Sequence, residues 1–184
     1  MKKILNALFI FVLAFGICLQ LSPKTSAAPP DDVDSATAEA LNAYGFYIGM
    51  QKNDVLNTYS NKENWLITDT SKNPLKINAT VSEDEIDKEI IADFNGEYLT
   101  SYSINFNVDY EEVAKTLFVQ AVSNMKTAVG RGADKVEPSD TGLAVNWIIP
   151  VDNDQPQIVS IALLKLADCD KEFCLSIKRN IANN

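Results

Sequence analysis

The chain has 184 residues, with 16 Lys or Arg, 25 Asp or Glu and no His, for a formal net charge of −9. Its content of 46% hydrophobic and 22% charged residues is typical of a globular protein and excludes a disordered or collagen-like chain. The absence of histidine excludes Ser-His-Asp hydrolases and histidine-ligated zinc enzymes. The acidic balance argues against a partner made of nucleic acid, which requires a basic face.

The first 27 residues have the pattern of a secretory signal peptide. Lys2 and Lys3 provide the positive start, residues 4–21 are almost wholly apolar, and Thr25-Ser26-Ala27 supplies small residues for cleavage after Ala27. We therefore expect an exported protein, periplasmic or extracellular, whose mature chain does not span the membrane.

Two alternatives remain for this segment. The apolar stretch is long enough for an uncleaved anchor, and Cys18 could be acylated in a lipoprotein, although the bulky Ile17 before it disfavours that processing.

Cleavage after Ala27 removes three lysines and leaves 13 bases against 25 acids, a formal charge of −12. A charged partner of such a protein should be basic. Residues 28–34 are rich in Pro and Asp and are expected to form a flexible leader.

Cys169 and Cys174 are the cysteines of the expected mature chain, and in an oxidising compartment they predict a structural disulfide. A redox role is the alternative, but their spacing is not the C-x-x-C of thiol oxidoreductases. Pairing them across a hairpin places Lys165 opposite Lys178 on an outer, solvated face.

Residues 35–184 are expected to form a single domain. A short helix is expected from Ser35 to Gly45 and a second from about Lys52 to Tyr59. Alternating apolar residues then predict strands at 65–67, 75–81, 90–94 and 98–108.

The segment around Asn95-Gly96 is the strongest hairpin signal. A two-residue Asn-Gly loop would place Ile90 and Tyr102 on opposite faces. A three-residue loop ending in a left-handed Gly96, with a bulge, places one set of apolar residues on a single buried face, and we expect that register. The set is Ile90, Ala92, Tyr98, Tyr102 and Ile104.

Asp109 and Glu112 predict the start of a long helix, which should end at Gly130. Its apolar stripe consists of Tyr110, Val113, Leu117, Phe118, Ala121, Met125 and Val129. A loop over 130–141 should follow, then strands at 143–149, 158–167 and 175–181, of which the second is apolar on both faces and should be interior.

This order of elements predicts an α+β fold. We expect an antiparallel sheet of about five to seven strands, with the long helix and the short N-terminal helices packed on one face. The order helix-then-strands occurs twice, which suggests an internal duplication without visible sequence repetition.

The segment from Phe46 to Val55, FYIGMQKNDV, resembles a signature of two groups of small exported modules. These are the outer-membrane assembly lipoproteins of the SmpA/OmlA type and the β-lactamase inhibitor proteins, in which a Gly-Met turn leads into a short helix and a β-meander. Gly49 would allow a sharp turn, Met50 would fill the core and Val55 would anchor the helix. The resemblance implies an extracytoplasmic, non-enzymatic, protein-binding module. With cleavage after Ala27 the mature chain would lack the N-terminal cysteine of the lipoproteins, and the Gly-Met unit occurs once, not twice as in the inhibitors.

No residue is nominated as catalytic, cofactor-binding or metal-binding. The acidic turns at 152–154 and 168–172 depart from calcium loops, since Pro156 and Gln157 occupy the fifth and sixth positions of the first and Arg179 replaces the final Glu of the second. Tyr98, Tyr102 and Trp147 are expected first as core residues of strands and, if exposed, as a binding surface.

The leading hypothesis is a secreted or periplasmic binding protein without catalytic activity, which recognises a protein or an envelope component. The exposed sheet face, or the loops at 60–64, 95–97 and 131–141, would supply the interface. A carboxylate-based hydrolase of envelope polymers and a carrier of a small apolar ligand are the alternatives. The sequence does not indicate the oligomeric state.

Overall fold

The computed structural model describes residues 45–60, 62–80, 86–139, 141–151, 155–167 and 169–182. The predicted signal peptide, the leader, nearly all of the helix expected from Ser35 and the acidic residues 152–154 lie outside these ranges.

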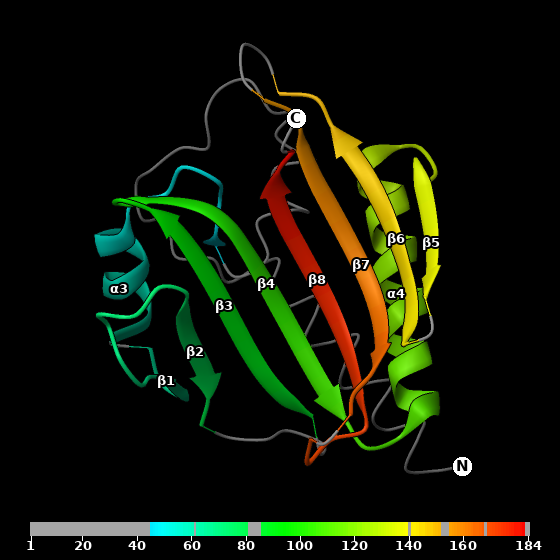
Figure 1. The fold of residues 1–184 in the computed structure, drawn as a ribbon, viewed down its shortest axis with the longest axis horizontal. Coiled ribbons are helices and arrows are strands. Elements are labelled where there is room, and N and C mark those ends of the chain that lie inside the picture. The colour runs from blue at the N-terminus through cyan, green and yellow to red at the C-terminus, as the bar shows by residue number, and fades with distance from the viewer. Residues whose placement is uncertain are drawn as a thin grey trace.

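Two helices and eight strands are described (Figure 1). In chain order they are α3 (Lys52–Ser60), β1 (Trp65–Ile67), β2 (Leu75–Ala79), β3 (Asp87–Asn95), β4 (Tyr98–Val108), α4 (Glu111–Val129), β5 (Lys135–Ser139), β6 (Gly142–Ile149), β7 (Gln157–Lys165) and β8 (Phe173–Ile181).

All eight strands belong to one antiparallel sheet in the order β1-β2-β3-β4-β8-β7-β6-β5. The predicted α+β class with an antiparallel sheet is confirmed, whereas the predicted strand number is too low. The additional strand is β5, at an edge of the sheet and inside the segment expected to be a loop. The predicted interior position of β7 is confirmed, since it lies between β8 and β6.

The fold consists of two consecutive units with the same order of elements. Helix α3 precedes the meander β1–β4, and helix α4 precedes the meander β5–β8. The units meet where β4 pairs with β8, so the strand order is unchanged when the two units are exchanged. The helix-then-strands order noted twice in the sequence therefore corresponds to the topology.

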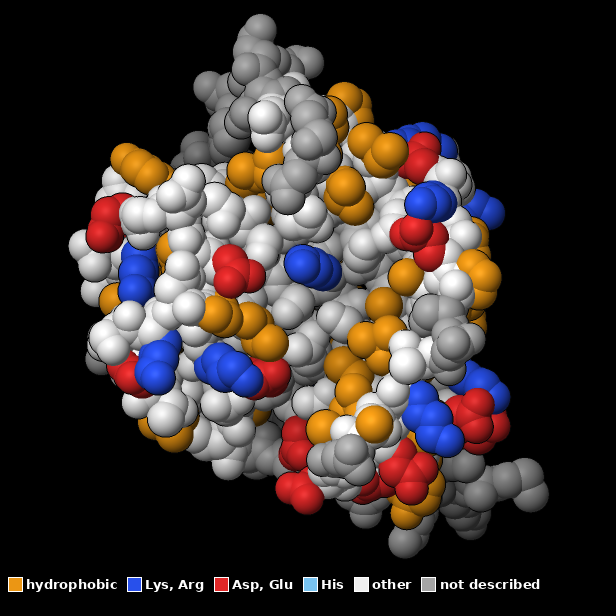
Figure 2. All heavy atoms as spheres, viewed as in Figure 1, with side chains coloured by type: hydrophobic (Ala, Val, Ile, Leu, Met, Phe, Trp, Pro, Cys, Tyr) orange, Lys and Arg blue, Asp and Glu red, His pale blue; other side chains and the backbone are white. Residues whose placement is uncertain are grey.

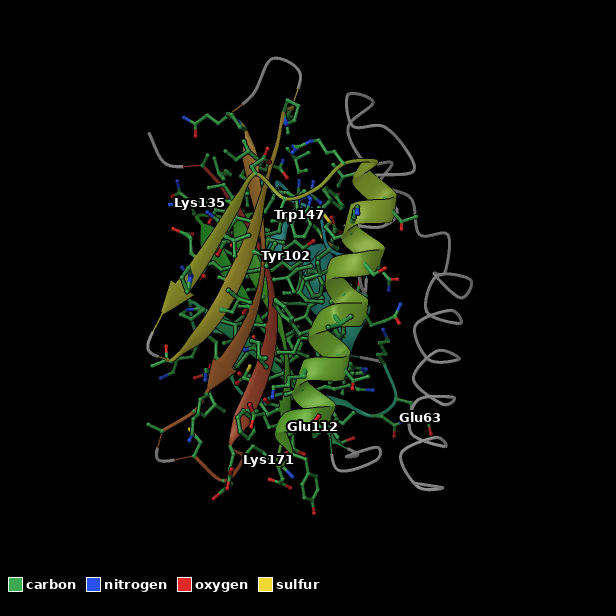
Figure 3. The ribbon with its side chains drawn as sticks, turned by 90° about the vertical axis from the view of Figure 1, so that its right-hand side faces the viewer. Glu63, Tyr102, Glu112, Lys135, Trp147 and Lys171 are labelled. Carbon is green, nitrogen blue, oxygen red and sulfur yellow. The ribbon has the colours of Figure 1, made fainter. Side chains whose placement is uncertain are left out.

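The helices and the sheet form two layers. Helix α4 packs against β4, β8 and β7, and Figure 3 shows it along one side of the sheet. Val55 and Tyr59 of α3 belong to the same buried cluster as the inward side chains of β2, β3 and β4. We call the opposite side of the sheet the open face, because no helix among the described residues covers it.

Helix α4 follows its predicted stripe with two corrections. It buries one row of side chains, Ala114, Leu117, Ala121 and Met125, and it ends at Gly130, whose φ of 71° permits the left-handed C-cap. Tyr110, expected on the stripe, is 61% exposed and takes the N-cap position without a side-chain hydrogen bond. Asp109 does not cap the helix, and its carboxylate instead accepts a hydrogen bond from Lys171 at 2.9 Å.

The β3–β4 hairpin has the predicted faces but a different turn. Asn95 pairs with Tyr98 around a two-residue Gly96-Glu97 turn, and a register shift between Asp93 and Phe94 then aligns Ile90 with Ile104 and Ala92 with Tyr102. A bulge is therefore present, but it lies between Asp93 and Phe94 and not in the turn, and the predicted three-residue loop is wrong. Tyr98 lies outside the bulge and is 55% exposed, so its expected burial is also wrong.

The Gly-Met segment adopts the geometry expected from its residue types. Gly49 has a φ of 90°, in a region that other residues rarely adopt, and its N–H donates to the Leu99 carbonyl at 2.7 Å. Met50 and Val55 are buried, and Phe46 stacks on Tyr59 with ring centroids 5.3 Å apart. The turn thus anchors α3 to the hairpin end of β4.

The predicted register of the last hairpin is wrong. Lys165 pairs with Phe173 across the hairpin, and Lys178 pairs with Ser160, so the two lysines are not opposite each other. Cys169 lies exposed in the intervening loop and Cys174 is buried on β8, and both are free thiols. The predicted disulfide is therefore not formed in the structure.

We expect the two thiols to differ strongly in reactivity. Burial, and to a lesser degree the nearby Glu89 carboxylate, raises the pKa of Cys174 to about 11, so very little of the reactive thiolate is present at pH 8. Iodoacetamide should label Cys169 in the native protein and Cys174 only after denaturation. Peptide mass spectrometry measures each site separately, and protection of both cysteines until a reductant is added would contradict this arrangement.

Candidate binding face

The three aromatic residues expected either in the core or on a binding surface lie in different environments. Tyr102 is 2% and Trp147 is 1% exposed, and Figure 3 shows both between the sheet and α4. They are core residues, so their assignment to a binding surface is corrected. Tyr98 is exposed at the start of β4, close to the hairpin turn.

Tyr102 belongs to a buried polar cluster. Arg179 of β8 pairs with Tyr102 of β4, is 4% exposed and donates from Nε to Oε1 of Gln157 at 2.6 Å. Burial raises the pKa of the Tyr102 hydroxyl, and the hydrogen-bonded Arg179 guanidinium partly offsets that rise. The hydroxyl is therefore satisfied within the core and is not available to a ligand.

Of the candidate loops, the segment 131–141 is tied to the sheet. Arg131 donates to Asp134 Oδ1 at 2.6 Å and to the Ile148 carbonyl at 2.7 Å, and Asp134 Oδ2 accepts from the Ile148 N–H at 2.7 Å. Arg131 and the Ile148 amide hold the pKa of Asp134 below its usual value. The turn at 95–97 is exposed, and the loop at 60–64 is described only in part.

The open face is a continuous side of the eight-stranded sheet that no helix covers among the described residues. At its middle lie hydroxyl and amide side chains from β4, β8 and β7, namely Ser101, Ser103, Asn105, Ser160, Ser176 and Asn180. Apolar side chains flank them on β3, β7 and β6, including the half-buried Ile91, Ile158 and Leu164 and the exposed Ile148. Figure 2 shows this face, with most charged side chains toward its border.

A chain of hydrogen bonds crosses the open face from β8 to β2. Ser176 donates from Oγ to Asn105 Oδ1 at 2.8 Å, and Asn105 donates from Nδ2 to Glu89 Oε2 at 3.3 Å. Lys76 completes the chain with a 3.3 Å contact from Nζ to Glu89 Oε1. We call this the β8–β2 chain.

A second chain with the same order of residue types runs from β7 to β5. Ser160 donates to Asn146 Oδ1, Asn146 donates from Nδ2 to Glu137 Oε2 at 2.6 Å, and Lys135 contacts Glu137 Oε1 at 2.5 Å. Lys135, with a further contribution from Asn146, holds the pKa of Glu137 below its usual value. We call this the β7–β5 chain. In both chains the serine proton is used within the chain, so the serine offers only lone pairs to a ligand.

Lys178 lies between the two chains. It pairs with Ser103 of β4 on one side and Ser160 of β7 on the other, and its side chain is exposed. Among the described residues, no carboxylate forms an ion pair with its ammonium group. Lys76 and Lys135 occupy the same row of the sheet, each three strands away, or about 14 Å, and their charges are paired.

Polar and apolar residues alternate along β4, which indicates that the outward-facing residues are polar. The polar composition of the open face could therefore be expected from the sequence. The position of Lys178 between Ser103 and Ser160 could not be expected, because the predicted hairpin register placed it opposite Lys165. The β8–β2 chain requires the pairing of β4 with β8, which no local pattern indicates. The β7–β5 chain requires β5, which lies in a segment expected to be a loop.

Comparison with protein-family models, with curated proteins and with solved structures finds no match. The resemblance at Gly49-Met50 therefore stays a prediction. In the part of the chain that the structure describes, no helix combines the length and apolar character that crossing a bilayer needs. Within the same residues, no three His, Cys, Asp or Glu side chains are grouped so that they could hold a metal ion.

Proposed function

We propose that the protein is an exported binding protein, acting in the periplasm or outside the cell, that recognises another protein through the open face of its sheet and performs no chemistry on it. The observation that carries this proposal is the composition of that face. A polar middle, in which two chains of side chains are hydrogen-bonded internally, is flanked by apolar residues such as Ile158 and Ile148. Protein interfaces combine apolar contact area with fixed polar groups in this way.

The carboxylates of this face support binding over hydrolysis. Glu89 and Glu137 are each engaged by a lysine and an asparagine, and Asp93 accepts a hydrogen bond from Ser101 at 2.8 Å. A glycoside hydrolase needs one carboxyl group kept protonated near its partner carboxylate. Glu137, whose pKa is lowered, has the opposite tendency.

The test is capture of partners from a cell-envelope extract by variants that differ in the position of one added side chain. Ala162→Tyr places an uncharged bulky group on the open face, whereas Val119→Tyr places the same group on an exposed position of α4. We expect the partner retained by the unmodified protein to be lost with Ala162→Tyr and kept with Val119→Tyr. Equal retention by both variants, or turnover of a glycan or peptide by the protein, would overturn the proposal.

A further inference from the structure

Lys178, which has no ion-pair partner among the described residues, indicates which chemical group the partner brings to the open face. We propose that the partner places the carboxylate of an aspartate or glutamate side chain against Lys178 and Ser103, at the centre of this face. This inference rests on the proposed function, and it adds the anchoring group of the interface.

The donors around Lys178 match a carboxylate. Ser103 lies directly opposite Lys178 on β4, and no hydrogen bond involves its hydroxyl among the described residues. Cross-strand partners have Cβ atoms about 5 Å apart, so the flexible Lys178 side chain can bring its ammonium group beside the Ser103 hydroxyl. A carboxylate has two oxygens and can accept from both groups at once, and such charge-assisted bonds are the stronger class.

The surrounding serines restrict where that carboxylate can lie. The hydroxyls of Ser160 and Ser176 donate their hydrogen bonds to Asn146 and Asn105, so toward a ligand both present lone pairs, which repel an anion and accept from N–H groups. The partner therefore needs an acid over Lys178 and Ser103, and hydrogen-bond donors over Ser160 and Ser176.

The neighbouring lysines do not offer an equivalent site. Lys76 and Lys135 are each paired with a glutamate, and at about 14 Å from Lys178 they lie beyond the screening length of about 8 Å at physiological salt. The mature chain expected after cleavage has 13 bases against 25 acids, a formal charge of −12, which favours a basic partner at long range. The expected partner is thus basic overall, with a single acid over Lys178.

A second copy of the same chain fits this face less well. If two open faces stacked centre to centre, two unpaired Lys178 side chains would meet without a carboxylate between them, and like charges in an interface are costly. A protein partner with an acidic side chain is therefore the occupant that the charges favour.

The test uses random peptides displayed on phage and selected on the purified protein, with removal of clones that still bind Ala162→Tyr. The remaining clones bind the open face, and we expect them to share an Asp or Glu. A synthetic peptide from the strongest clone should lose about tenfold or more in affinity when Lys178 is changed to methionine, which keeps the stem and removes the charge. Lys178→Arg should restore binding. Lys126→Met, which changes an exposed lysine of α4 away from the open face, is the matched control that should leave binding unchanged.

A double-mutant cycle then tests whether the acid of the peptide contacts Lys178 directly. Changing the acid of the peptide to its amide should cost the same factor as Lys178→Met, and combining both changes should cost little more. Open-face peptides that lack an acid, or that bind Lys178→Met unchanged, would overturn the inference and leave the proposed function standing. If every selected clone binds Ala162→Tyr equally well, the proposed function fails. Concentration-dependent dimers of the protein that Ala162→Tyr abolishes would overturn the inference in favour of a second copy.

Discussion

Replacing Trp147 by alanine is expected to lower the free energy of unfolding by about 3–5 kcal/mol. The side chain is 1% exposed and lies in the core between the sheet and α4, so its removal leaves a large cavity among groups that cannot close around it. It also removes the indole N–H that donates to the Arg131 carbonyl at 3.4 Å. Urea unfolding followed by far-ultraviolet circular dichroism measures the change without relying on tryptophan fluorescence.

The matched control is the next residue in the chain. Ile148 points to the open face and is 49% exposed, so Ile148→Ala should cost no more than about 1 kcal/mol. If Trp147→Ala does not fold, Trp147→Phe should lower the free energy of unfolding by a smaller amount that can still be measured. Should Ile148→Ala prove the more damaging change, the assignment of the two sheet faces would be reversed, and the open face would not be a surface at all.

The elements predicted most accurately are those defined by a local period. The stripe of Leu117, Ala121 and Met125 specifies the buried side of α4, and the alternation of Tyr102, Ile104 and Phe106 specifies the buried side of β4. In both, a periodic row of apolar side chains can be buried in only one orientation.

The sequence predictions are wrong where a strand has no buried face, as in β5, or where the predicted register depends on a disulfide and not on the apolar pattern, as in the last hairpin. The segment Lys135–Ser139 contains two charged residues and Pro138, a composition that protects an edge strand and that is also typical of a loop. The register of the last hairpin was derived from an assumed Cys169–Cys174 bond. The apolar pairing of Ile161 with Ile177 instead fixes β7 against β8.

The candidate site could be predicted only as a composition. Ser101, Ser103 and Asn105 alternate with buried residues and must face solvent, which the sequence indicates. Lys178 becomes their neighbour only through the pairing of the two meanders, which depends on contacts between distant parts of the chain. Functional surfaces of this kind arise from topology, and a single sequence contains little direct information on topology.

Replacing Gly142 by alanine should also be strongly destabilising, for a different reason from the Trp147 change. A Cβ atom built on Gly142 would overlap the carbonyl oxygen of Leu163 and lie 2.9 Å from its carbonyl carbon. These are backbone atoms of the neighbouring strand, so the clash cannot be relieved by rotating a side chain. The start of β6 must move away from β7, which would weaken the hydrogen bond from the Lys165 N–H to the Thr141 carbonyl, 2.7 Å long.

We expect this change to lower the free energy of unfolding by about 1–3 kcal/mol, with faster amide exchange at the β6–β7 end as its local signature. Gly132→Ala is the matched control, since a Cβ there meets nothing within 4 Å. The control should be neutral or stabilising by up to about 1 kcal/mol, because alanine restricts the unfolded chain. Gly142 pairs with Leu164 on the open face. A loss of stability in Gly142→Ala and not in Gly132→Ala would therefore support the close approach of β6 to β7 in the sheet that carries the proposed interface. Equal stability of the two variants would contradict that close approach.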